Sequence, residues 1–259
     1  YKDLGDVPKA ISYHEESLAM QKLIYGDKPH PDIATTLGSL GSAYYSLGDT
    51  SKAIIYYKES LAMNRLTYGD KPHPDIATTL DCLGSAYYGL GDVPRAIAYF
   101  EESLATYKLI YGDKSHPHIA TSLNNLGVAY NTLGDASKAI VYFTESLAMR
   151  KLIYGDKPHP NIAISLSNLG DTYRNLGDTP KAISYHEESL AMKRLVYQDK
   201  PHPSIAKSLW HLGATYNGLG DSTKAIRYYE QSYTMFIETY GPEHQHTRTV
   251  LNKLNALKN

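Results

Sequence analysis

The fold is decided by the stretch from Pro31 to Asp49, PDIATTLGSLGSAYYSLGD, because closely similar stretches recur at a fixed distance along the chain. A period of about 20 to 50 residues is typical of solenoids and propellers, in which each unit contacts mainly its neighbours. The closing Gly-Asp pair of the stretch returns every 43 residues, at Gly5-Asp6, Gly48-Asp49, Gly91-Asp92, Gly134-Asp135, Gly177-Asp178 and Gly220-Asp221.

The composition excludes several classes of partner and compartment. Lys and Arg number 26 and Asp and Glu 27, so the net charge of −1 gives no reason to expect nucleic acid or an anionic membrane as the partner. The single cysteine, Cys82, excludes an intrachain disulfide, and no apolar run is long enough to span a membrane. The chain opens at Tyr1 in the middle of a repeat, so we expect it to be part of a longer protein. Because the sequence offers neither a disulfide nor a membrane span, we expect that protein to be cytoplasmic.

Each 43-residue unit is predicted to form a pair of helices, such as Pro31–Leu47 and Asp49–Tyr68. Proline suits a first helical turn, because its missing N–H is not needed there, and Gly48 can take the left-handed conformation that ends helices. The sequence therefore predicts an all-α chain of about twelve helices without strands. We expect one solenoid made of a partial repeat with a second helix only at 1–30, full repeats at 31–73, 74–116, 117–159, 160–202 and 203–245, and a C-terminal capping helix at 246–259.

The residues that recur in every unit carry a family resemblance. In the first full repeat they are Leu37, Leu40, Gly41, Tyr44, Gly48, Ala53, Tyr57 and Ser60. This pattern resembles that of tetratricopeptide repeats, whose usual length is about 34 residues. The nine additional residues follow Met63, and this long form is similar to the repeats of kinesin light chains and nephrocystin-like proteins. The resemblance implies a right-handed superhelical α-solenoid of stacked antiparallel helix pairs.

The recurring residues of the first helix share one face and are expected to pack against the second helix. Gly41 and Ala53 are small enough to let the two axes approach to about 8–10 Å. Three tyrosine columns account for 18 of the 24 tyrosines. We interpret these columns as rings packed between layers with their hydroxyls at the edge, rather than as a stacking platform for bases.

Five positions of the first helix hold different residues in different repeats. We call these five positions, taken over all full repeats, the varying stripe. In the first full repeat they are Gly38, Ser39, Ser42, Tyr45 and Ser46. Their spacing places them on one side of the helix, roughly opposite the packing face. One interpretation is a solvated surface that drifts because nothing constrains it. The other is a binding surface.

The resemblance implies that the varying stripe lines a concave groove that holds peptides. Asparagine both donates and accepts hydrogen bonds and can hold a peptide backbone, whereas Arg174 and Lys207 suit a carboxylate and Trp210 suits an interface anchor. The groove is predicted to be richest in contacts toward the C-terminal half. The candidate partner-binding residues are Asn124, Asn125, Asn131, Asn168, Asp171, Arg174, Asn175, Lys207, Trp210 and His211.

No metal site and no cofactor are expected. Most of the eleven histidines lie one to a turn, and equivalent turns are two helices apart, too far for bonds of about 2 Å to a shared ion. His14 and His186 replace aromatic residues in a packing column and are interpreted as ring-shaped fillers. Two pairs within single turns are the exceptions that stay open: His116 with His118, and His244 with His246.

No catalytic residue is predicted either. Cys82 has no evident base on its stripe, and the chain holds no phosphate loop, hydrolase elbow or paired acidic motif. Helical repeats that read RNA need a basic lining, which the near-neutral stripe lacks. Clamps for chaperone tails need Lys in the first groove columns, which hold Gly38, Ser39 and Ser42 instead.

The sequence therefore predicts a non-catalytic scaffold that binds a protein or peptide segment. Because repeat arrays of one fold serve many partners, two alternatives stay open. One is a regulatory or sensor array of a larger signalling protein, such as an NTPase. The other is a structural spacer that associates end to end with further copies of itself.

Overall fold

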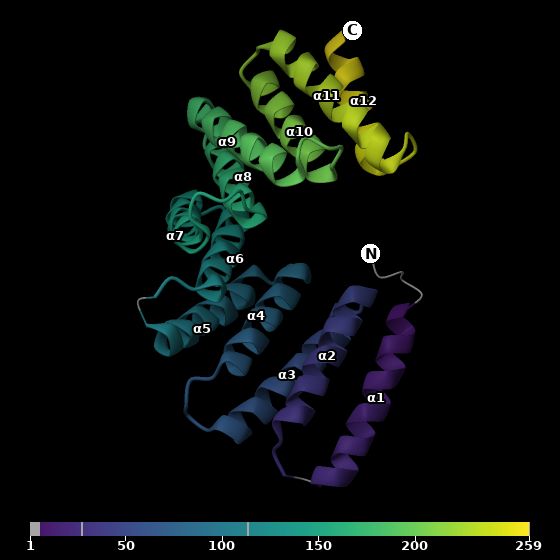
Figure 1. Cartoon of the computed structure of the whole chain (residues 1–259), viewed down its shortest axis with the longest axis vertical. Coiled ribbons are helices and arrows are strands. Elements are labelled where there is room, and N and C mark those ends of the chain that lie inside the picture. Colours follow the sequence, from purple (N-terminus) through teal and green to yellow (C-terminus); the bar gives the residue numbers. More distant parts are fainter. Residues whose placement is uncertain (1–5, 27, 113, 259) are drawn as a thin grey trace. The chain divides into compact units, whose positions relative to one another are not determined.

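The computed structural model describes residues 6–26, 28–112 and 114–258, which form twelve helices and no strand (Figure 1). The all-α prediction is confirmed, and helices stack as antiparallel pairs. The helices are α1 (Asp6–Tyr25), α2 (Pro31–Leu47), α3 (Thr50–Tyr68), α4 (Pro74–Gly89), α5 (Val93–Tyr111), α6 (Pro117–Leu133), α7 (Ala136–Tyr154), α8 (Pro160–Asn175), α9 (Thr179–Tyr197), α10 (Pro203–Gly218), α11 (Ser222–Tyr240) and α12 (Gln245–Lys258).

The helix boundaries follow from their capping residues. Every first helix begins at the predicted proline, and Gly48 ends α2 with a φ of 90°, in the left-handed region. The second helix α3 begins one residue later than expected, because Asp49 is its N-cap and accepts a hydrogen bond from the Lys52 N–H at 3.0 Å. The last helix, α12, begins at Gln245, one residue before the expected capping segment 246–259.

The turn that lengthens each repeat is held by a stacked tyrosine and histidine. His30 lies on the ring of Tyr25 with a centroid distance of 3.6 Å, and its Nδ1 accepts the backbone N–H of Asp32. The equivalent pairs Tyr68–His73 and Tyr154–His159 stack in the same way. These histidines therefore cap the first helices, since each accepts a backbone N–H of the first turn.

Within a pair, an aromatic ring lies directly over a glycine. A Cβ atom at Gly41 would come within 2.6 Å of the Tyr57 ring, and one at Gly84 within 2.5 Å of the Phe100 ring. The glycine column therefore allows the second helix to lie close to the first, as predicted. Two of the tyrosine columns also stack on each other in four of the pairs, as Tyr44 does on Tyr56 at 5.3 Å.

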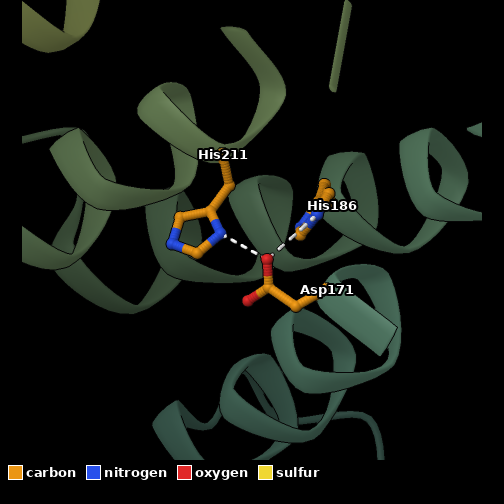
Figure 2. A group of neighbouring side chains, drawn as sticks. All are labelled: Asp171, His186 and His211. Carbon is orange, nitrogen blue, oxygen red and sulfur yellow. Dashed lines mark hydrogen bonds and ion pairs between the residues drawn. The ribbon is translucent and has the colours of Figure 1, made fainter. Parts of the chain in front are cut away.

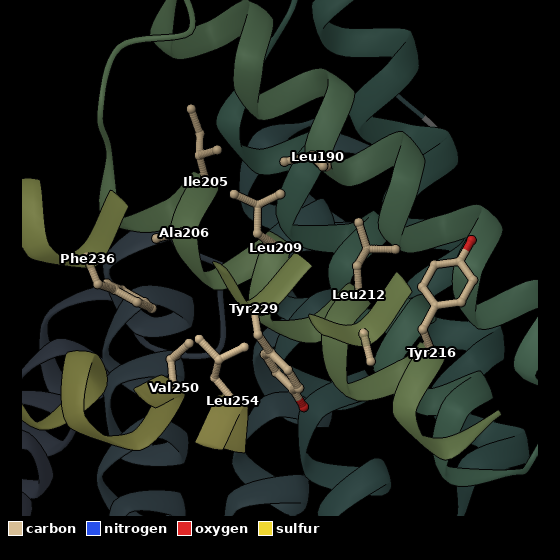
Figure 3. Close-up of a cluster of buried hydrophobic side chains, with 11 residues drawn as sticks. Leu190, Ile205, Ala206, Leu209, Leu212, Tyr216, Tyr229, Phe236, Val250 and Leu254 are labelled. Carbon is tan, nitrogen blue, oxygen red and sulfur yellow. The ribbon is translucent and has the colours of Figure 1, made fainter. Parts of the chain in front are cut away.

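The chain forms two compact units, residues 1–133 with α1 to α6 and residues 134–259 with α7 to α12. Each unit is built from neighbouring helices in chain order. In the second unit the core continues from α9 through α10 and α11 to the last helix, α12 (Figure 3). The buried side chains of this core are Leu190, Ile205, Ala206, Leu209, Leu212, Tyr216, Ala225, Tyr229, Phe236, Val250 and Leu254.

Candidate functional site

The first unit contains a hollow of about 590 Å³ between α1, α2, α3 and α4. Much of the varying stripe of α2 lines it, with Gly38, Ser39, Ser42 and Ser46. These side chains are too small to fill the space themselves. The hollow therefore lies on the Gly/Ser-rich half of the stripe, whereas the sequence favoured the C-terminal half.

Polar groups border this hollow from the second helix and from the next repeat. The Nδ2 of Asn64 donates to Thr79 Oγ1 at 3.3 Å, and the Asn64 Oδ1 atom is buried without a hydrogen-bond partner among the described residues. The Tyr57 hydroxyl donates to Ser42 Oγ at 3.1 Å. Cys82 also lines the hollow, and burial raises the pKa of its thiol, so the thiolate form is disfavoured there.

In the second unit, three side chains from three successive helices meet: Asp171 of α8, His186 of α9 and His211 of α10 (Figure 2). The His211 Nδ1 lies 2.7 Å from Asp171 Oδ1, and the His186 Nε2 lies 3.7 Å from the same oxygen. Arg174 approaches Asp171 Oδ1 from one turn further along α8, at 3.5 Å.

Burial and charge set the protonation of this cluster. Burial lowers the pKa of His186 to about 4, so its ring is neutral at pH 7. Burial also acts to raise the pKa of Asp171, but the hydrogen bond from His211 and the nearby positive charges outweigh it and hold that pKa below its usual value. The cluster therefore contains a carboxylate and a neutral buried imidazole.

Two buried cations lie at equivalent positions of α7 and α9. Arg150 donates to the Asn161 carbonyl at 2.6 Å and to Ser165 Oγ at 2.8 Å. Lys193 donates to Ser208 Oγ at 2.7 Å. Burial lowers the pKa of Arg150 to about 10 and that of Lys193 to about 8. Each cation thus joins a second helix to a hydroxyl of the following first helix.

The predicted groove residues fall into both units. Asn124 is only 8% exposed, which leaves little of its side chain for a ligand to touch. The exposed candidates are Arg174, Asn175 and Lys207. The half-buried candidates are Asn125, Asn131, Asn168, Asp171, Trp210 and His211.

The second unit separates its candidates into two places. Asp171 and His211 come together in the cluster of Figure 2, and the Arg174 guanidinium lies 3.5 Å from Asp171 Oδ1. Lys207 and Trp210 instead line a smaller hollow of about 250 Å³, together with side chains of α11 and α12. Trp210 also packs partly against the hydrophobic core, so it has a structural role there.

The sequence interpretation missed one column of the second helices. Its members differ from repeat to repeat, because each contacts different partners. Five of the six are nevertheless buried. Variation along the stripe was taken as a sign of freedom from packing, and this column shows that buried positions vary as well. The signal was visible at a spacing of 43 residues, in Gln21, Asn64, Tyr107, Arg150, Lys193 and Phe236.

In the described part of the chain, every helix is too short or too polar to cross a bilayer. The sequence matches the family model described as tetratricopeptide repeat over residues 1–65, 75–151, 153–194 and 204–254. No curated protein matches the chain.

Solved structures with similar folds include two proteins that match over most of both chains. BtubC (BKLC) from P. vanneervenii is 22% identical with a TM-score of 0.76, covering 91% of this chain and 92% of its own. A protein described as a kinesin light chain with nearly identical repeats, from Podospora anserina, is 22% identical with a TM-score of 0.68, covering 82% of this chain and 98% of its own.

A third similar structure is a repeat-containing sensor in a larger protein. It is the signal transduction ATPase with numerous domains and a tetratricopeptide repeat sensor from Pyrococcus horikoshii. The identity is 17% and the TM-score 0.73, and the match covers 95% of this chain but only 36% of that protein. At these identities the three likenesses concern the fold.

Proposed function

This chain belongs to the tetratricopeptide-repeat family, and on that premise we propose that it is a non-catalytic scaffold that binds a peptide or protein segment along its varying stripe. Repeat arrays of this family generally bind proteins. The observation that carries the proposal is the hollow of about 590 Å³ in the first unit, which the stripe of α2 lines. A hollow of this size is in the range of sites that bind ligands.

The chemistry of the hollow suits a peptide backbone. The hydroxyls of Ser39 and Ser46 each donate to a carbonyl of their own helix, at Thr35 and at Ser42. A hydroxyl oxygen has two lone pairs, so it can also accept an N–H from a bound chain. Such contacts do not depend on the side chains of the bound segment, which fits a segment held mainly through its backbone.

In the second unit, Arg174 of the stripe and Lys207 next to the stripe offer positive charge. Arg174 is 40% exposed at its side chain, and its planar guanidinium can hold a carboxylate with two hydrogen bonds. Lys207 is exposed and beside Trp210 at the smaller hollow. We infer that acidic groups of a partner bind at these two cations.

A peptide-display selection on the purified protein, followed by fluorescence anisotropy with the selected peptides, tests the proposal. The double variant Ser39→Arg/Ser46→Arg places long side chains in the hollow and is expected to weaken binding at least about tenfold. Arg174→Ala is expected to weaken binding of acidic peptides by about 5- to 30-fold, because an ionic hydrogen bond contributes about 1–2 kcal/mol.

Matched controls carry the same substitutions away from the stripe. Ser12→Arg/Ser51→Arg changes two exposed serines of α1 and α3, and Arg227→Ala changes an exposed arginine of α11. Both are expected to bind peptide as the parent does. Equal binding by the Ser39→Arg/Ser46→Arg variant and its control would rule out the hollow as the binding site.

A further inference from the structure

We propose that Asp171, His186 and His211 form a binding site for a divalent transition-metal ion, with Zn²⁺ as the ion that fits the ligand set best. Asp171 and His211 also lie on the varying stripe, but the proposal does not depend on peptide binding. Two imidazole nitrogens and one carboxylate oxygen are common zinc ligands, and three protein ligands leave a fourth position for water.

The three ligand atoms already lie close together. One nitrogen of each histidine and one oxygen of Asp171 all lie within 4.8 Å of one another, and the side chains point toward a common centre (Figure 2). Around a tetrahedral zinc ion with bonds of about 2.0–2.1 Å, neighbouring ligand atoms are about 3.3 Å apart. The Asp171–His211 pair at 2.7 Å would widen slightly, and any wider pair would close by at most about 1.5 Å.

His186 supplies the independent observation that points to a ligand. Its side chain is 0% exposed, and neither ring nitrogen has a hydrogen-bond partner among the described residues. A buried polar group without a partner is costly, so native proteins rarely keep one without a reason. A metal bond to Nε2 would satisfy that nitrogen.

Packing alone does not explain a histidine at this position. The His186 ring lies against Gly170, just as the rings of Tyr57 and Phe100 lie against their own glycines. Phenylalanine fills the position in two repeats, at Phe100 and Phe143, and both are buried without any polar atom. What histidine adds over phenylalanine is therefore its two nitrogens.

The other two ligands are also departures from the repeat pattern. The position of His211 holds Ser39, Cys82, Asn125 and Asn168 in the other repeats. The position of Asp171 holds Ser42, Ser85, Val128 and Ala214. The positions of Asp171 and His211 thus change to metal-binding residue types where α8, α9 and α10 meet, and their side chains converge there with His186, whose position also holds histidine at His14.

The surrounding charges agree with a metal ion as the occupant. Asp171 supplies a carboxylate, whose negative charge suits a cation. Arg174 is the present counter-ion of Asp171, and its partly exposed side chain can turn to solvent when a metal ion takes its place. The positive charge of Lys193 disfavours a second cation at this site, and the same charge lowers the pKa of His186. The Lys193 ammonium group, however, donates hydrogen bonds to Ser208 and Ser167.

Isothermal titration of tag-free, chelator-treated protein with Zn²⁺ tests the site. We expect one ion per chain and a rise in the melting temperature, since an ion that binds the folded state stabilises it. His186→Phe and His211→Asn place residues that other repeats carry at the same positions, so both variants are expected to keep the fold by circular dichroism. Each is expected to lower the affinity about 100-fold or more.

The control variant is His118→Asn/His246→Asn, which removes one histidine from each of the paired turn histidines. Its binding is expected to match that of the parent. Zinc-edge X-ray absorption of the parent adds a readout without any variant, with two imidazoles expected in the first shell. The proposal is overturned if the parent binds no Zn²⁺, if either His186→Phe or His211→Asn keeps the parent's affinity, if the control loses it, or if the first shell holds fewer than two imidazoles.

Discussion

Asp81 and Asn124 occupy equivalent positions in neighbouring repeats and differ only by a carboxylate in place of an amide. Asp81 accepts hydrogen bonds from Ser122 Oγ on α6, at 3.1 and 3.0 Å to its two oxygens. Burial raises the pKa of Asp81 to about 6 despite these bonds. A charge at this position therefore costs stability, whereas the amide found one repeat later would not.

Replacing Asp81 with asparagine is expected to stabilise the protein at neutral pH by about 1–3 kcal/mol, because one pKa unit corresponds to about 1.4 kcal/mol. The folded-state pKa is raised above the unfolded value of about 3.9, so the folded state binds the proton more tightly. The cost of the charge is fully present above about pH 6 and disappears as the pH falls toward about 4.

Urea unfolding of the parent and of Asp81→Asn between pH 4 and pH 7 measures this difference. The advantage of the variant should be largest at pH 7 and shrink toward pH 4. An advantage that is constant with pH would show that the Asp81 carboxyl titrates normally in the folded protein.

At the scale of the element, a helix pair depends on the close approach of one ring to one glycine. The Phe100 ring of α5 fills the space where a side chain at Gly84 of α4 would lie. Because the ring and the helix backbone are both fixed by packing, even one methyl group has no room. This contact recurs at Gly41, Gly170 and Gly213, so it sets the geometry of pairs in both units.

Gly84→Ala is expected to destabilise the protein by about 1–3 kcal/mol through overpacking, although alanine alone favours a helix over glycine by about 1 kcal/mol. Gly218→Ala is the matched control, because nothing lies within 4 Å of a Cβ atom there. The control is expected to be neutral or slightly stabilising. If urea midpoints show Gly84→Ala to be as stable as Gly218→Ala, the ring does not set the distance between the helices.

These elements were predictable because their signals are local. Pro31 and Gly48 mark both ends of α2 within the sequence of that helix, and a spacing of 43 residues repeats the information. The meeting of Asp171 with His211 was not predictable, because it joins residues 40 positions apart on two helices. Their distance depends on how neighbouring first helices are aligned, which the composition of either helix does not determine. His186 was correctly placed in a packing column, but its neighbours could not be seen from that column.

At the scale of the whole molecule, the positions that stay constant between repeats and those that vary have different roles. Columns that stay constant hold helices together, as the glycine and ring contacts do in both units. Columns that vary either line the stripe, as Ser39 does, or join one repeat to the next, as Lys193 does. Variation between repeats therefore indicates a binding surface only at positions that are also exposed. A single continuous solenoid with a groove along it stays a prediction.

Hydrogen–deuterium exchange with and without a selected peptide tests the central proposal, that the varying stripe of the first helices is the binding surface. Bound peptide is expected to slow amide exchange in α2 and α4, which line the hollow, and to leave the outward part of the second helix α5 unchanged. Protection confined to second helices, with exchange in α2 and α4 unaltered, would contradict it.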